Sequence, residues 1–386
     1  MKKLLFIFQL LVTFSGTIKA QTEQEDCLLT VSLLTVTPGA ELYSSFGHSA
    51  FRVHHAQTGE DIIFNYGTFD FNDPDFYSKF VRGKLLYFVS AEEPRYFMLQ
   101  YNYEGRGVTE QILNLSCEDK QQLFHALKEN LREDNKYYHY DFLYDNCSSR
   151  LWEMMKKHTS GNYELKYILP EEEVRFRNLL HEYLDKGGQY WNKLGIDILL
   201  GLPVDKKMKN EQAVFLPDYL MKAMDSTTVS GSPLVVSKNV ILPMTYQPEM
   251  NRFTRPLVIF TIFWVITAFL SLNRKTAAST FMKIFDCIFF MLTGAVGWLL
   301  LFMWFGTNHA ACAWNLNLLW ALPVNVVTAF WIFNQDKHRK YFRVLALWYL
   351  ILMIIWIFLP QQMNLALIPI VATAFIRSIA RAGKFL

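Results

Sequence analysis

Residues 140–155, YDFLYDNCSSRLWEMM, raise the central structural question of this sequence. They predict a helix that begins at Cys147, with Asn146 as its N-cap and with Leu151, Met154 and Met155 on one face. A cysteine at the start of a helix can be half of a disulfide, a small buried hydrophobe or a nucleophile. The rest of the chain narrows this choice.

The composition divides the 386-residue chain into two parts. The formal net charge of +3 is too small to indicate a nucleic-acid partner, and 52% hydrophobic residues are too many for one soluble domain. Residues 21–253 look like an ordinary polar globular sequence, whereas residues 254–386 are mostly apolar blocks separated by short basic loops. We therefore expect an exported domain followed by a membrane domain.

The first 20 residues, MKKLLFIFQLLVTFSGTIKA, have the pattern of a signal peptide. Two lysines precede an apolar run that is too short for a comfortable membrane span, and small residues follow up to Ala20. We expect cleavage after Ala20, with an uncleaved anchor as the alternative. Because no lipobox-like run precedes Cys27, the chain is not expected to be a lipoprotein itself.

The membrane domain is expected to contain five transmembrane helices, because it has five apolar stretches. They lie at about residues 257–272, 281–305, 314–333, 343–359 and 364–379. Lys and Arg gather after the first and third stretches and in the C-terminal tail, while the loops GTNHAACA and PQQMN contain none. The positive-inside rule then places the exported domain outside the cytoplasm and the C-terminus inside it. Lys283 and Asp286 are interpreted as polar groups that snorkel at a helix end, with a functional polar site as the alternative.

The exported domain is expected to have an α+β fold. Strands are predicted at residues 28–36, 48–55, 62–67, 84–91 and 107–115, and an amphipathic helix at residues 117–134. Residues 160–250 look mainly helical, with residues 186–207 as a glycine-containing connector. Asp197 and Asp205 in that connector are expected to serve packing and capping.

The cysteine count bears on the role of Cys147. The exported domain contains Cys27, Cys117 and Cys147, which is an odd number for an oxidising compartment. A disulfide between Cys27 and Cys117 would leave Cys147 free, although other pairings remain open. The N-terminus of a helix stabilises a thiolate, and its N–H groups can bind the oxyanion that forms when the thiolate attacks a carbonyl.

A nucleophile needs a base, and His48 is the candidate. It opens the predicted strand 48–55 directly after Gly47, and the following strand carries Asn65, a polar side chain that could orient an imidazole. His139 is a competing base and Asp70 a competing orienting residue.

These residues resemble a known family. The segments GHSAFRV with His48 and DNCSSRL with Cys147 are similar to circularly permuted papain-like thiol domains, which are related to the NlpC/P60 peptidases and the lecithin:retinol acyltransferase group. The segments NYGTFDF, LPDYL and NLNLLWALP, together with the membrane domain, resemble the bacterial lipoprotein N-acyltransferase that has an N-terminal periplasmic domain.

The resemblance implies a two-step acyl transfer at the inner membrane of a bacterium. Cys147, with His48 as base and Asn65 as orienting residue, would take an acyl chain from a membrane phospholipid and pass it to the N-terminal cysteine of a diacylated lipoprotein. No metal or cofactor is implied. The periplasm would hold the thiol domain and the cytoplasm the C-terminus.

A second candidate region is the loop GTNHAACAWNLNLLWALP. We expect His309, Asn315 and Asn317 to line the substrate path, with a simple membrane-interface loop as the alternative. Two other functions also remain open at this point. One is a membrane-anchored amidase or endopeptidase that uses Cys147 and His48 on cell-wall peptides, and the other is a non-enzymatic envelope sensor or scaffold.

Overall fold

Seven strands of the exported domain form one antiparallel sheet in the computed structural model, which describes residues 27–250 and 253–383. The order across the sheet is β10-β5-β1-β2-β3-β4-β6. The strands are β1 (Leu29–Val36), β2 (His48–His55), β3 (Asp61–Thr68), β4 (Leu86–Glu92), β5 (Val108–Leu113), β6 (Tyr137–His139) and β10 (Val235–Leu242). The predicted signal peptide at residues 1–20 lies outside the described residues.

The first five strands agree with the sequence-based prediction to within a few residues, but β10 does not. Its segment was expected to be part of a mainly helical region, whereas it pairs with β5 at the edge of the sheet. Most of its side chains are exposed, so the strand has little of the apolar alternation that marks a half-buried strand. A smaller sheet contains β7 (Tyr163–Leu165), β8 (Thr227–Val229) and β9 (Ser232–Pro233).

Helices cover both faces of the large sheet. The helices of this domain are α2 (Phe76–Val81), α3 (Pro94–Tyr103), α4 (Cys117–Asn130), α5 (Cys147–His158), α6 (Phe176–Lys186), α7 (Tyr190–Leu199) and α8 (Pro217–Ser226). Because side chains alternate along a strand, Phe51 and Phe64 enter the main core with Leu151 of α5, while Ala50 and Ile63 enter a smaller core under α3. The result is the α+β architecture that the sequence predicts.

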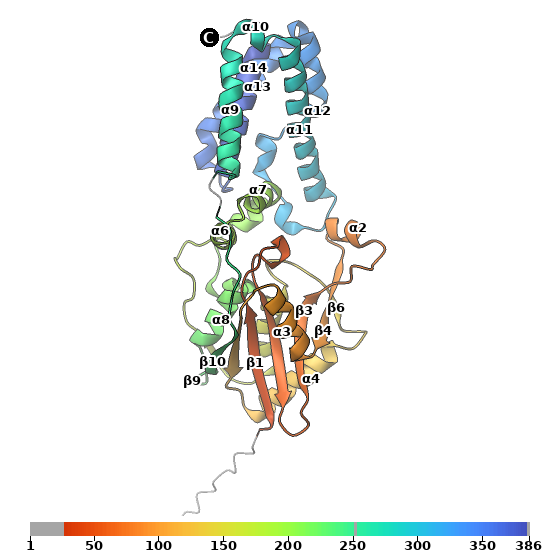
Figure 1. Ribbon diagram of the computed structural model, residues 1–386, viewed down its shortest axis with the longest axis vertical. Helices are drawn as coiled ribbons and strands as arrows, with labels where there is room; N and C mark the ends of the chain where they lie inside the picture. Colours follow the sequence, from red (N-terminus) through yellow and green to blue (C-terminus); the bar gives the residue numbers. More distant parts are fainter. Residues whose placement is uncertain (1–26, 251–252, 384–386) are drawn as a thin grey trace, which may run out of the picture.

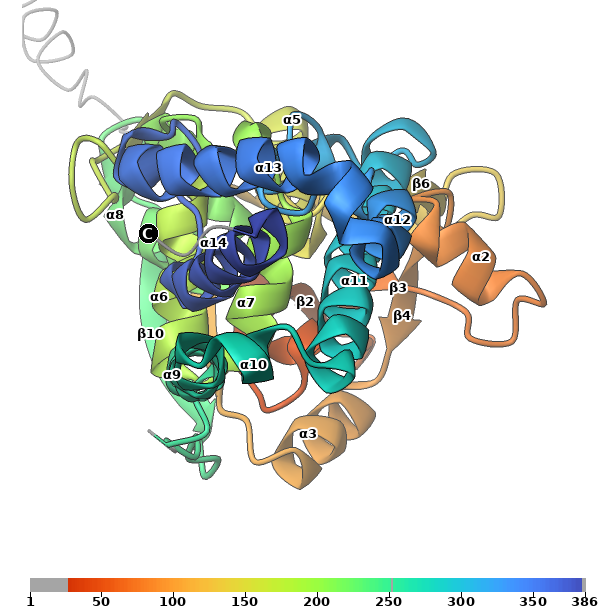
Figure 2. The ribbon, with the colours of Figure 1, turned by 90° about the horizontal axis from the view of Figure 1, so that it is seen from above.

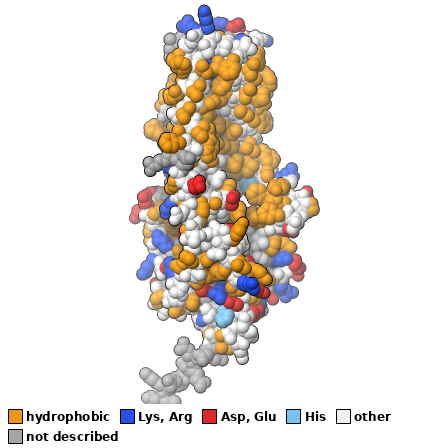
Figure 3. Space-filling model, viewed as in Figure 1, with side chains coloured by type: hydrophobic (Ala, Val, Ile, Leu, Met, Phe, Trp, Pro, Cys, Tyr) orange, Lys and Arg blue, Asp and Glu red, His pale blue; other side chains and the backbone are white. Residues whose placement is uncertain are grey.

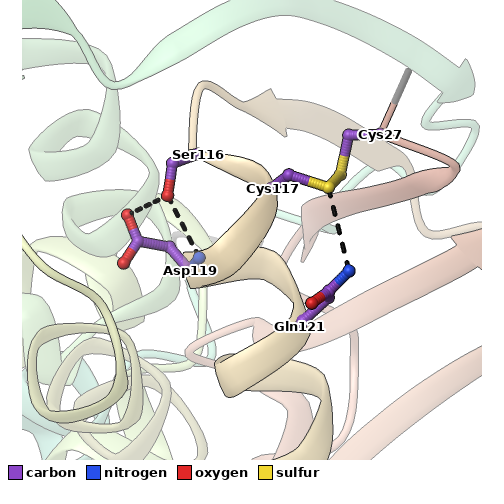
Figure 4. Close-up of a disulfide and its surroundings, with 5 residues drawn as sticks. All are labelled: Cys27, Ser116, Cys117, Asp119 and Gln121. Atoms are coloured by element: carbon purple, nitrogen blue, oxygen red, sulfur yellow. Dashed lines mark hydrogen bonds between the residues drawn. A yellow bond between two sulfur atoms is a disulfide. The ribbon is translucent and has the colours of Figure 1, made fainter. Parts of the chain in front are cut away.

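A disulfide between Cys27 and Cys117 joins the segment before β1 to the first residue of α4 (Figure 4). Ser116 caps the same helix end, as its hydroxyl accepts the N–H of Asp119. This is the pairing considered from the cysteine count, and it leaves Cys147 free.

The membrane domain contains three helices that are long and apolar enough to cross a bilayer, counted over the described residues. They are α11 (Thr280–Phe305), α13 (Gln335–Ile355, with its apolar run continuing to Phe358) and α14 (Ile368–Ala382). The 17-residue α9 (Pro256–Leu272) is a shorter apolar helix, and α10 (Arg274–Ala277) and α12 (Asn325–Thr328) are single turns. Seen from above, the long helices are arranged over α7, while α2 and α3 project beyond them (Figure 2).

The expected third span at residues 314–333 is not one continuous helix. It consists of short 3-10 segments around α12, with Pro323 between them. Its backbone packs closely on α11, since a Cβ at Gly294 would lie 2.5 Å from the Val326 nitrogen and one at Gly297 would overlap the Ala321 carbonyl. Irregular backbone at membrane depth is tolerated where protein covers it, and these two glycines allow that close approach.

A buried ion-pair cluster lies near the other end of α11, and it corrects the interpretation of Asp286 as a snorkelling residue. The Asp286 carboxylate is fully buried and accepts hydrogen bonds from Arg377 at 2.6 Å and Arg381 at 2.5 Å, both on α14. Asp286 therefore ties two membrane helices together. Lys283, one turn away, is only half-buried.

A second buried cluster joins the exported domain to the membrane domain. Arg177 of α6 pairs with Asp197 at 2.8 Å and with Asp205 at 2.9 Å, and all three side chains are buried. Asp197 also accepts from Asn364, and Asp205 accepts the N–H of Gln362 in the membrane domain. The two aspartates thus do more than the packing and capping expected of them.

Candidate active site

The candidate site lies where β2 and β3 separate. β2 pairs with β1 along its whole length, and His48 lies opposite Val36. With β3, however, β2 pairs only from Phe51 to His54. Between His48 and Ala50, β2 is not paired with β3, and α5 packs against both strands. Gly67 occupies the β3 side of this gap with φ +92°, a conformation that glycine adopts without strain. The gap admits Cys147.

The structure brings together the three residues that the sequence singled out. The side chains of His48 and Cys147 lie close enough for each to shift the pKa of the other. The other side of the imidazole is held by Asn65, whose Oδ1 lies 2.6 Å from His48 Nε2. Since Nε2 faces Asn65, Nδ1 is the ring nitrogen left for the thiol.

The electrostatics of the pair favour a thiolate beside an imidazolium. Burial by itself would raise the pKa of Cys147, but the charge and hydrogen bond of His48, with smaller contributions from the Ser49 backbone and Ser148, lower that pKa below its ordinary value. Burial would likewise lower the pKa of His48, but the Cys147 charge and hydrogen bond, and the bond to Asn65, raise it. Each group therefore shifts the pKa of the other in the direction that favours its charged form.

The start of α5 is fixed by a capping box. Asn146 Oδ1 accepts the N–H groups of Ser148 and Ser149 at 2.9 and 3.0 Å, and the Ser149 hydroxyl accepts the Asn146 N–H at 2.8 Å. The Asn146 amide also donates to the carbonyls of Phe142 and Phe215. The predicted cap is confirmed, and it occupies two of the helix N–H groups that could otherwise bind an oxyanion.

Sequence reasoning missed Glu92. Its carboxylate accepts a hydrogen bond from Asn65 Nδ2 at 2.8 Å, which extends the row to Cys147, His48, Asn65 and Glu92. The residue is the last of β4, and β4 pairs with β3. The sequence does show a polar residue at the end of this strand. It does not show that Glu92 lies beside Asn65, because the pairing of β4 with β3 decides that.

The two competing residues lie elsewhere. His139 is exposed on β6, opposite Leu86 of β4. Asp70 is exposed in the loop after β3, and its carboxylate accepts the N–H of Asn72. Among the described residues, no hydrogen bond joins either of them to Cys147.

Figure 1 shows α7 between the large sheet and the membrane helices, and the contacts of Gln189 beside α7 place the site at this end of the sheet. The connection before His48 is bonded to Gln189, whose side chain accepts from Ser45 at 2.5 Å and donates to the carbonyls of Gly39 and Ala40. Gln189 directly precedes α7, and Trp191 of α7 contacts the ring of Phe260 on α9. His48 is thus linked to the membrane domain through one short helix.

His309, Asn315 and Asn317, the residues expected to line a substrate path, form contacts between the domains. Asn315 donates to the carbonyls of Ile198 and Leu199 at the end of α7, and Asn317 donates to that of Asp197. The His309 ring lies 3.1 Å from the Phe80 carbonyl of α2. Among the described residues, none of these side chains is hydrogen-bonded to His48 or Cys147. Nor does the described part of the chain contain three His, Cys, Asp or Glu side chains grouped as a metal site.

Comparison with known proteins gives two matches. Residues 20–181 match the family model of the Lnb N-terminal periplasmic domain, and residues 248–383 match that of the Lnb transmembrane domain. No curated protein and no solved structure matches the chain. The first match contains the whole Cys147, His48 and Asn65 site.

Proposed function

The chain carries the two domains of the Lnb family, periplasmic and then transmembrane, and from this premise we propose that it is a lipoprotein N-acyltransferase with Cys147 as its nucleophile. It is a membrane protein with a periplasmic domain. One observation carries the proposal: a buried thiol of lowered pKa is paired with His48 at the membrane-facing end of the sheet.

In the first step, the Cys147 thiolate attacks the ester carbonyl of a membrane phospholipid. A C–S bond forms, and the C–O bond to glycerol breaks. The leaving alkoxide takes the proton of the His48 imidazolium and departs as a lysophospholipid. In the second step, the α-amine of a diacylated lipoprotein attacks the thioester. A C–N bond forms, the C–S bond breaks, and His48 takes the amine proton, which restores the ion pair.

Asn65 and Glu92 act as positioning residues in this scheme. The Asn65 oxygen accepts from Nε2 and so directs Nδ1 of His48 toward the sulfur, while Glu92 holds the Asn65 amide in its orientation. The N–H of Cys147 and the backbone of Ser49 are the candidates for binding the oxyanion, because Asn146 occupies the next two N–H groups of α5.

The membrane domain also supports this function. An acyl ester and a diacylated acceptor both lie in the bilayer, so an enzyme that joins them needs its thiol held close to the lipid surface. In this proposal, His309, Asn315 and Asn317 act indirectly, through their contacts between the two domains. Their contacts with α2 and α7 would set the height of the thiol above the bilayer and so define the substrate path.

The decisive experiment compares lipoproteins from cells that produce the wild-type chain or the Cys147→Ala variant. Mass spectrometry of N-terminal lipopeptides should show the amide-linked acyl chain with the wild type and not with the variant. Cys312→Ala is the matched control, since Cys312 is also free and buried. Unchanged lipopeptides would reject the proposal, and altered cell-wall peptides with unchanged lipopeptides would support the amidase or endopeptidase.

A further inference from the structure

The segment after β3 exposes an unusual set of apolar side chains. Phe71 and Tyr77 are 70% and 79% exposed, and Phe80 and Val81 are also exposed, within eleven residues around α2. Contiguous exposed apolar side chains on a folded domain mark a surface that contacts a membrane, a ligand or another protein. We call residues 69–81 the aromatic lip.

The position of the aromatic lip indicates that its partner is a membrane. The N–H of Asn308 donates to the Arg82 carbonyl at 2.9 Å, and the His309 ring lies 3.1 Å from the Phe80 carbonyl. Both residues lie in the loop after α11, whose last residue, Phe305, is exposed. The lip is therefore joined to the end of a membrane-crossing helix (Figure 1).

The apolar surface of the lip continues that of the membrane domain. Figure 3 shows hydrophobic side chains gathered at the height of α2, beside the apolar surface of the helices above. Trp304 and Trp314 contact each other at 4.9 Å close to this junction, and tryptophans favour the boundary between lipid and water. Arg82 and Lys84 are exposed next to the lip and suit anionic phosphate headgroups.

The lip is also connected to the thiol by a row of ring contacts. Phe80 contacts Phe76 at 6.0 Å, Phe76 contacts Phe69 at 5.7 Å, Phe69 contacts Tyr87 at 5.4 Å, and Tyr87 stacks on Tyr140 at 4.5 Å. Tyr140 and Cys147 meet at Gly67, where a Cβ would lie 3.6 Å from the tyrosine ring and 3.8 Å from the Cys147 Cβ. The row thus leads from the membrane boundary to the sulfur.

We propose that the aromatic lip enters the outer leaflet and that the acyl chain of the donor lipid lies along the ring row from Phe80 to Tyr140 on its way to Cys147. This inference rests on the proposed acyltransferase function. It adds a lipid-binding surface and assigns a role to side chains that do not touch the reacting atoms.

The first test measures acylation of Cys147 by intact-protein mass spectrometry. The full-length protein in vesicles of phosphatidylethanolamine and phosphatidylglycerol is compared with the double variant Phe71→Ser and Tyr77→Ser. Acylation by the vesicle lipids should fall about tenfold or more, because two large apolar rings no longer enter the leaflet. Acylation by water-soluble p-nitrophenyl butyrate should not change. Tyr103→Ser, which alters a 94% exposed ring on α3, is the matched control and should affect neither donor.

An unchanged rate with the vesicle lipids would overturn the inference. An equal loss with both donors would overturn it too, because the variant would then damage the thiol site and not lipid delivery. If the wild type is acylated by neither donor, the proposed function fails, and a second test judges the lip by itself.

The second test is independent of activity. Benzoylphenylalanine in place of Tyr77 should form photo-crosslinks to phospholipid in the same vesicles, whereas benzoylphenylalanine in place of Tyr103 should not. Crosslinks at position 77 only to protein, or none at all, would reject the lip as a membrane-contacting surface.

Discussion

At the scale of single residues, the reactivity of Cys147 depends on one neighbour. Burial raises the pKa of a thiol, and the charge and hydrogen bond of His48 are the largest of the effects that bring the pKa of Cys147 below its ordinary value. In the proposed mechanism, His48 is therefore the neighbour that makes Cys147 acidic enough to act as the nucleophile.

Alkylation of Cys147 by iodoacetamide tests this dependence. In the wild type the rate should persist as the pH falls below the ordinary thiol pKa, and it should be lost only as the pH falls through the lowered pKa of Cys147. His48→Ala should reduce the rate at neutral pH by about tenfold or more, since each unit of pKa changes the thiolate fraction tenfold. His139→Ala alters an exposed histidine and should leave the rate unchanged. The same pH profile in wild type and His48→Ala would disprove the ion pair.

The hydrogen bond between His48 and the Asn65 oxygen leads to a different prediction. Because the Asn65 oxygen helps to raise the pKa of His48, the Asn65→Ala variant should have a lower His48 pKa. The imidazolium would then deprotonate at lower pH, so the basic limb of the pH–rate profile for Cys147 acylation should move to lower pH. Glu92→Gln keeps an oxygen acceptor for Asn65 and should move this limb less. A reduced rate with an unmoved basic limb would argue for a structural role alone.

The three catalytic candidates could be found in the sequence because each has a local signal. Cys147 follows an N-cap, His48 opens a strand after a glycine, and Asn65 lies on the next strand of the hairpin. Glu92 could not be placed in the same way, because its contact with Asn65 depends on how β4 registers against β3, 27 positions along the chain.

At the scale of elements, the capping of α5 holds the sulfur in place. Asn146 makes hydrogen bonds at both ends of its amide, to the helix N–H groups and to two carbonyls outside the helix. The cap therefore fixes the direction of α5 as well as its first turn.

A comparison of the N-caps Asn146 and Ser116 distinguishes the effect of a cap on protein stability from its effect on the reactivity of Cys147. Loss of an N-cap side chain costs about 0.5–2 kcal/mol, and Asn146→Ala should exceed Ser116→Ala because it also leaves two carbonyls without their donor. Thermal unfolding in detergent measures this difference. Only Asn146→Ala should slow the alkylation of Cys147, since Ser116 caps α4 instead. Equal alkylation rates in both variants would show that the cap does not position the thiol.

The elements that could not be predicted are those fixed by distant partners. The break at residues 314–333 depends on two glycines of α11 as well as on Pro323, and an apolar stretch by itself favours a continuous span. β10 is a strand because β5 offers a free edge to it, far away in the sequence. Periodicity detects neither kind of partner.

At the scale of the whole molecule, two buried charge clusters join parts that are far apart in the chain. Arg177 with Asp197 and Asp205 lies at the boundary of the two domains, and Asp286 with Arg377 and Arg381 lies between membrane helices. Removing one partner of such a cluster leaves the opposite charge buried.

The membrane cluster gives a stability prediction. Asp286→Asn removes the carboxylate that pairs with both arginines of α14, and it should destabilise the protein by about 3–5 kcal/mol. Thermal unfolding in detergent and the amount of protein recovered from membranes both report this loss. Lys283→Gln, on the same helix and half-buried, should change either measure little. Equal stability of Asp286→Asn and the wild type would show that the cluster is not needed for folding.

The hydrogen bonds of α7 have a consequence for the position of Cys147. One end of this helix is bonded through Gln189 to the connection before His48, and the other end is bonded to Asn315 and Asn317 of the membrane domain. In the proposed function, these bonds at both ends of α7 would hold the sulfur of Cys147 at one distance from the lipid surface. An enzyme built in this way would discriminate among ester bonds by their depth in the bilayer.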